Sequence, residues 1–129
     1  MLHLEAAPTI KLYTIYNHAV NNRDKLKELI KRFSYQDGKQ ADLLEDIDRI
    51  VSITLEQEIK IGDSLRRVEE LLGPPFTIIG EEEDEQMYWL YPASPLENKP
   101  DQFPEEWFYV LSFYNKQLRK VEKRTYRLH

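Results

Sequence analysis

The sequence predicts an α+β fold, with N-terminal helices followed by a three- or four-stranded antiparallel β-meander. Up to about residue 72, apolar residues recur mostly every three or four positions; after residue 75 the pattern changes to short aromatic and β-branched runs separated by turn residues. Successive strands joined by short turns favour antiparallel pairing. We expect a single domain over residues 1–129, with a helical half over 9–57 and a helix plus sheet over 59–127.

The first half is predicted to be helical. Residues 9–33 carry a helical stripe that Asn21 and Asn22 interrupt, and Asn22 can cap a helix over residues 25–33. Residues 9–16 are rich in β-branched and aromatic types, so a strand is an alternative there. A second helix is predicted over residues 40–55, because its apolar side chains share one stripe.

A short helix over residues 64–72 has both ends marked in the sequence. Asp63 or Ser64 can accept hydrogen bonds from its first free N–H groups. Gly73 is expected in the left-handed conformation that ends a helix, and Pro74 prevents continuation. The apolar residues of this segment fall on one helical stripe, which supports the prediction of a helix.

Four segments after Pro75 are strand candidates, namely residues 76–80, 86–91, 107–114 and 118–127. Residues 81–84 and 115–117 are expected to form turns between them. Residues 92–106 contain four prolines and few large apolar side chains, which predicts a surface loop.

Part of this pattern is similar to a known family. The positions concerned are Ile61-Gly62-x-Ser64-x-x-x-Val68-x-x-x-Leu72-Gly73-x-Pro75, Trp89-x-Tyr91 and Leu111-x-Phe113. They resemble the SmpA/OmlA family of small outer-membrane-assembly lipoproteins, whose fold is shared by the β-lactamase inhibitor protein, over about residues 59–120. The resemblance implies two short helices, or a helical lead-in, packed on a three- or four-stranded antiparallel sheet and, more loosely, a protein-binding role. Since the family's signal and acylated cysteine are missing, a role in outer-membrane assembly is not carried over.

Composition excludes several classes of function. The chain is 41% apolar and 32% charged, as is typical of globular proteins. A net charge of −5 makes general nucleic-acid binding unexpected. The absence of cysteine excludes disulfides, thiol nucleophiles and zinc–thiolate sites. With neither a secretory signal nor an apolar run of about 18 residues, we expect no membrane span and a cytoplasmic location.

No catalytic, metal or cofactor motif is recognised, so no catalytic residue, metal ligand or cofactor is predicted. The histidines at positions 3, 18 and 129 do not have the spacing of metal ligands. The chain has no P-loop, nucleophile elbow or Gly-x-Gly-x-x-Gly motif. A small hydrolase-type enzyme would need a carboxylate site, for which Asp63 with Glu69 or Glu70 is the alternative. Helix capping and solvation explain these residues more simply.

Two charged segments lie in the second half. Residues 81–85 are all acidic and are expected to form a solvated turn. Six basic residues lie within positions 116–127, in the last predicted turn and strand, among them Arg119, Lys123 and Arg127. They can protect a sheet edge from aggregation, which we favour, or contact an acidic protein or a nucleic acid.

Aromatic residues occupy both faces of the predicted sheet, because side chains alternate along a strand. Either the N-terminal helices cover the second face, which we favour, or a partner does. The candidate partner-binding residues are the aromatic residues of one face or of the other. They are Trp89, Tyr91, Trp107 and Tyr109, or else Tyr88, Phe108 and Tyr114.

The function that the sequence favours is a non-catalytic protein–protein interaction module: an adaptor, inhibitor or immunity-like protein that uses an aromatic-rich sheet face. Its partner is an unknown protein, and a second copy of the chain, forming a homodimer, is one candidate. The alternatives are the small hydrolase-type enzyme and nucleic-acid binding through the basic C-terminal strand.

Overall fold

The computed structural model describes residues 22–33, 41–81, 83, 85–95 and 107–126. Helices cover residues 22–33, Ala41–Gln57 (α2) and Leu65–Leu72 (α3). The strands that follow are Thr77–Ile79 (β1), Gln86–Pro92 (β2), Trp107–Tyr114 (β3) and Gln117–Thr125 (β4). The predicted α+β fold, with helices first and an antiparallel meander after them, is confirmed. The expectations for residues 9–21 and 96–106 lie outside the described residues.

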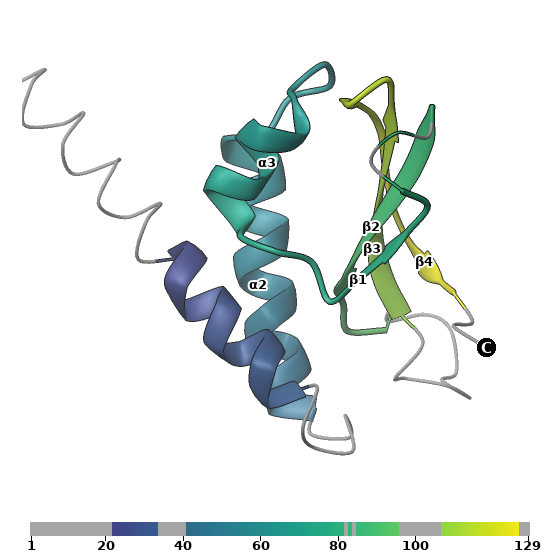
Figure 1. Ribbon diagram of the computed structural model, residues 1–129. Coiled ribbons are helices and arrows are strands. Elements are labelled where there is room, and N and C mark those ends of the chain that lie inside the picture. Colours follow the sequence, from purple (N-terminus) through teal and green to yellow (C-terminus); the bar gives the residue numbers. More distant parts are fainter. Residues whose placement is uncertain (1–21, 34–40, 82, 84, 96–106, 127–129) are drawn as a thin grey trace, which may run out of the picture.

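The elements form two layers (Figure 1). The three helices lie together on one side of the sheet, with α3 in front of the upper part of α2 and the helix of residues 22–33 beside α2. The strand order is β1-β2-β3-β4, so β1 and β4 form the two edges of the sheet. Residue 22 is already helical, which corrects the expectation that Asn22 caps a helix starting at residue 25.

The short helix α3 begins where its cap predicts. Ser64 Oγ accepts a hydrogen bond from the backbone N–H of Arg67 at 3.1 Å, which makes Ser64 the N-cap. The other candidate cap, Asp63, accepts instead from the backbone N–H of Lys60 at 2.9 Å. At the C-terminal end, Gly73 has φ 74° and ψ −172°. The positive φ agrees with the prediction, but the extended ψ differs from the left-handed helical conformation that was expected.

A tight turn fixes the register of the last two strands. Asn115 and Lys116 connect β3 to β4 with φ values of 50° and 64°. Positive φ at both central residues is the type I′ conformation, whose twist matches that of the strands it joins. A register shift between Ser112 and Phe113 then accommodates one additional residue on β4. The turn is therefore one residue shorter than predicted.

The face of the sheet that meets the helices carries the main core. Met87, Trp89 and Tyr91 of β2 and Leu111 and Phe113 of β3 are buried there with apolar residues of all three helices. The helical members are those of the predicted stripes: Leu26, Leu29, Ile30, Phe33, Leu43, Leu44, Ile47, Ile50, Val51, Val68, Leu71 and Leu72. The hydrophobic effect therefore holds the two layers together.

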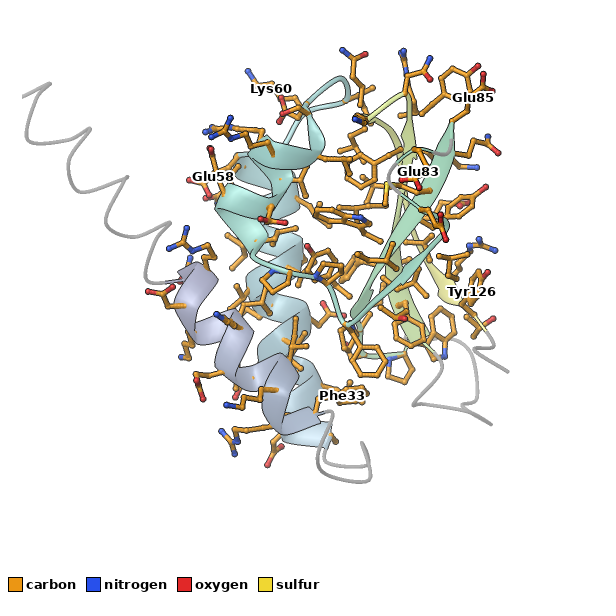
Figure 2. All side chains as sticks on the ribbon, viewed as in Figure 1. Phe33, Glu58, Lys60, Glu83, Glu85 and Tyr126 are labelled. Atoms are coloured by element: carbon orange, nitrogen blue, oxygen red, sulfur yellow. The ribbon has the colours of Figure 1, made fainter. Side chains whose placement is uncertain are left out.

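A smaller apolar cluster lies on the opposite face. Leu90, Phe108 and Val110 are buried there, with Tyr88 and Tyr126 packed against them. Figure 2 shows Tyr126 on the side of the sheet away from the helices. The described helices do not cover this face, contrary to the expectation, because they bury their stripes against one another and against the inner face.

Candidate functional site

A groove lies between α3 and the hairpin of β1 and β2. Its volume is about 770 Å³. The lining consists of Leu65, Arg66 and Glu69 from α3 together with Ile78, Gly80, Glu81, Glu83, Met87 and Trp89 from the hairpin. A hollow of this size is within the range of about 300–1,000 Å³ found for ligand sites in proteins.

Ile78 is the exposed apolar residue of the groove. In β1 it pairs with Trp89 of β2, and residues that pair directly lie on the same face of a sheet. Trp89 belongs to the main core, yet Ile78 is 47% exposed. The inner face of β1 is thus left open beside α3, which has only eight residues.

Gly80 shapes the end of the groove where β1 turns toward β2. Its φ is +97°, and a Cβ at this position would lie 3.0 Å from the carbonyl oxygen of Gln86 and 3.2 Å from Met87 Cα. The atoms that would be crowded belong to the backbone, so they cannot move aside cheaply. Glycine is therefore the residue that allows this close turn.

Trp89 contributes the buried aromatic surface of the groove. Its ring centroid lies 5.1 Å from that of Phe113, and the residue is only 5% exposed. Among the described residues, the Nε1–H of Trp89 has no hydrogen-bond acceptor. A buried donor without an acceptor costs about 1–3 kcal/mol.

The rim of the groove is acidic. Glu69, Glu81 and Glu83 line it together with one cation, Arg66, whose guanidinium lies 3.8 Å from the carboxylate of Glu70. Figure 2 shows Glu83 on the connection between β1 and β2, nearer to the helices than Glu85 at the tip of the sheet. Apolar surface and negative charge are therefore combined in one place.

A second polar cluster joins α2 to the far end of the sheet. Asp48 of α2 accepts hydrogen bonds from the backbone N–H and the Oγ of Ser94, at 2.9 and 3.0 Å, and from the hydroxyl of Tyr109 at 3.0 Å. The ammonium of Lys123 lies 2.9 Å from Asp48 Oδ2 and 5.5 Å from the centre of the Tyr109 ring. The members of this cluster bind one another, so the cluster connects α2 to the sheet.

Two tyrosines, the partly buried Tyr109 and the buried Tyr91, have raised pKa values. Burial raises the pKa of Tyr109, and the negative charge and hydrogen bond of Asp48 raise it further. Burial also raises the pKa of Tyr91 well above its usual value, with a smaller contribution from Glu69. The Tyr91 hydroxyl donates to the carbonyl oxygen of Gly73 at 2.8 Å and so ties β2 to the end of α3.

The aromatic residues predicted to bind a partner are placed differently from one another. Trp89 and Tyr91 are almost fully buried in the main core, where Tyr109 is partly buried, and Phe108 is buried on the outer face. Trp107 is 7% exposed and belongs to neither of the two apolar clusters. Tyr88 is partly buried and Tyr114 is 38% exposed. Of these seven residues, Trp89 is the one that lines the groove.

One of the three basic residues predicted to contact a partner already has a partner within the structure. Lys123 is occupied by Asp48. Arg119 is exposed and meets only the side chain of Gln117 among the hydrogen bonds described, at 3.5 Å. Arg127 lies outside the described residues. Lys123 is therefore not available to contact a partner together with the other two residues.

The carboxylates considered for catalysis do not gather into one described cluster. Asp63 binds a backbone N–H, Glu69 lines the groove and Glu70 faces Arg66. Within residues 22–33, 41–81, 83, 85–95 and 107–126, no three histidine or acidic side chains are placed to hold a metal ion. No helix in the same segments has the length and apolar character needed to cross a membrane.

Comparison of the chain with protein-family models, with curated proteins and with solved structures finds no match.

Three residues that matter here were missed by the reasoning from sequence. Ile78 was treated only as part of an apolar run; the brevity of the run and the prolines before it could have indicated an edge strand. Asp48 could have been found by its spacing, since it lies four residues after Leu44 and three before Val51, on the buried stripe of α2. Nothing in the sequence indicated Ser94 as its partner.

Proposed function

We propose that this chain is a non-catalytic protein-binding module, of the adaptor, inhibitor or immunity type, and that it receives its partner in the groove between α3 and the β1–β2 hairpin. The observation that carries the proposal is Ile78, an exposed isoleucine on the core-facing side of an edge strand, beside Trp89. Exposed apolar surface within a hollow is typical of interaction sites.

The other exposed large apolar residues of the described segments do not have this setting. They are Ile53, Ile61 and Tyr114, and none of them lines the groove. Scattered exposed apolar residues need no explanation, whereas one that faces a hollow with a buried aromatic residue does. The binding surface is thus moved from the sheet face, where the sequence suggested it, to the junction of sheet edge and helix.

Two further expectations belong to the proposal. The similarity to the SmpA/OmlA family is supported by the order of α3, Gly73 and an antiparallel sheet, and it is consistent with a protein-binding role. The expected compartment is the cytoplasm, which fractionation of the source cell would test.

Affinity capture with a matched pair of variants tests the proposal. Ile78→Thr removes apolar surface from the groove but keeps a β-branched residue in the strand; Ile61→Thr makes the same change at a residue that is 61% exposed outside the groove. We expect wild type and Ile61→Thr to capture the same partner from the source cell, and Ile78→Thr to bind it about tenfold more weakly, which corresponds to about 1.4 kcal/mol. Equal capture by both variants, each confirmed to be folded, would contradict the proposal.

A further inference from the structure

Building on the proposed function, we infer that the groove binds a basic segment of its partner protein, in which Lys or Arg residues lie on both sides of a large apolar side chain. The inference concerns the chemistry of the occupant. It rests on how charge and apolar surface are distributed around the groove.

Charge is the first argument. Among the described residues that line the groove, three are acidic, Glu69, Glu81 and Glu83, and one is basic, Arg66, which gives these residues a formal excess of two negative charges. The charge of Arg66 is further offset by Glu70, because the two side chains lie 3.8 Å apart. These negative charges would repel an anionic occupant, such as a nucleic-acid backbone. A cationic segment would be attracted and oriented by it.

The placement of the carboxylates is the second argument. Glu69 stands on α3, whereas Glu81 and Glu83 stand on the β1–β2 connection, so negative charge is present on both walls. The same two walls also carry the apolar side chains of the groove, which are Leu65 on α3 and Ile78, Met87 and Trp89 on the hairpin. An occupant that matches this pattern carries an apolar side chain in the middle and cations on either side.

The available space is the third argument. A volume of about 770 Å³ is enough for several side chains of a peptide. Burying the exposed surface of Ile78 against an apolar side chain would supply affinity, at about 25 cal/mol for each Å² removed from water. The cations at the rim would mainly supply orientation and a faster association.

Peptide selection on the full-length chain tests the inference directly. A phage-displayed library of random dodecapeptides is selected on the wild-type chain, and the enriched peptides are synthesised for measurement of Kd. Each peptide is then measured with the double variant Glu69→Gln/Glu83→Gln and with the control Glu45→Gln/Glu56→Gln, which makes the same change of net charge at exposed residues of α2. Thermal unfolding confirms that both variants are folded.

We expect enriched peptides to carry Lys or Arg around a large apolar residue, to bind the groove variant at least tenfold more weakly, and to bind the control within about twofold of wild type. The affinity should also fall as salt is added. If the groove variant does not fold, Glu69→Gln alone, with Glu45→Gln as its control, makes the same comparison.

Three other results would overturn the inference, and they have different meanings for the proposed function. Peptides that lack basic residues but lose affinity in Ile78→Thr would exclude a basic occupant and leave the binding module intact. Peptides with no dependence on Ile78, or no enriched peptide at all, would reject the groove as the binding site. Self-association of the chain that the Glu69→Gln/Glu83→Gln pair abolishes would show a second copy in the groove.

Discussion

Lys123 of β4 and Asp48 of α2 form an ion pair at 2.9 Å, with only 21% and 14% of their side chains exposed. The pair connects an edge strand of the sheet to the central helix of the other layer. Ser94 and Tyr109 complete the hydrogen bonds of Asp48. A lysine that the sequence presents as one of a row of surface cations is therefore part of the interface between the two layers.

Asp48→Asn is expected to lower the free energy of unfolding by about 2–3 kcal/mol, because it removes the negative partner of a largely buried ammonium and disrupts the hydrogen bonds of Tyr109 and Ser94. Urea denaturation measures the change. The matched control is Asp46→Asn on the same helix, whose partner Arg49 is exposed, and it should cost less than about 1 kcal/mol. Equal effects of the two substitutions would show that the Asp48 cluster does not hold the layers together.

The stability of the protein is expected to fall at alkaline pH because of the buried Tyr91. Burial raises the pKa of Tyr91 in the folded state, so the unfolded chain releases this proton first as the pH rises above about 10. The stabilisation is therefore complete below pH 10 and is lost above it. The unfolding free energy of Tyr91→Phe should therefore decline less steeply with pH than that of the wild type. The difference between the two slopes should be up to about 1.4 kcal/mol per pH unit. Identical slopes in the two proteins would contradict this assignment.

Tyr91→Phe should also destabilise the protein at neutral pH. The substitution removes the donor that satisfies the carbonyl oxygen of Gly73, at 2.8 Å in a buried position. A buried acceptor left without a partner costs about 1–3 kcal/mol. Tyr114→Phe, at an exposed tyrosine, serves as the control in thermal unfolding and should change little.

Gly73→Val is expected to lower the unfolding free energy by about 1–3 kcal/mol, since a φ of 74° with an extended ψ is essentially restricted to glycine. A Cβ would also lie 3.3 Å from Arg23 Cγ, in the helix of residues 22–33. Gly62→Val is the comparison: its φ is +100°, but no atom is within 4 Å of its Cβ among the described residues. A smaller loss for Gly73 than for Gly62, measured by chemical denaturation, would show that the contact with Arg23 is unimportant.

The elements of this fold are largely predictable from local patterns. The bounds of β3 agree with the prediction because aromatic and β-branched residues run from Trp107 to a turn at Asn115. The cap of α3 was predictable to within two residues, Asp63 or Ser64, because the capping hydrogen bond is local. Periodicity also predicts which side of α2 is buried, because the period of a helix does not depend on its neighbours.

The arrangement of the layers was not predictable in the same way. Alternation along β3 separates its two faces, but it does not say which one meets the helices. That choice depends on how α2 and α3 pack together, which involves residues far apart in the sequence. The same limit applies to the groove, because Ile78 is exposed only through the position of α3 relative to β1.

The measurement that tests the central claim most directly is nuclear magnetic resonance of the two tryptophan Nε1–H groups while the captured partner is added. Trp89 lines the groove and Trp107 does not, and the spectrum of Trp107→Phe assigns the two signals. Binding in the groove predicts that the Trp89 signal shifts or broadens with the same Kd as the whole interaction, while the Trp107 signal stays in place. An unchanged Trp89 signal in a chain that is saturated with its partner would contradict the assignment of the groove as the binding site.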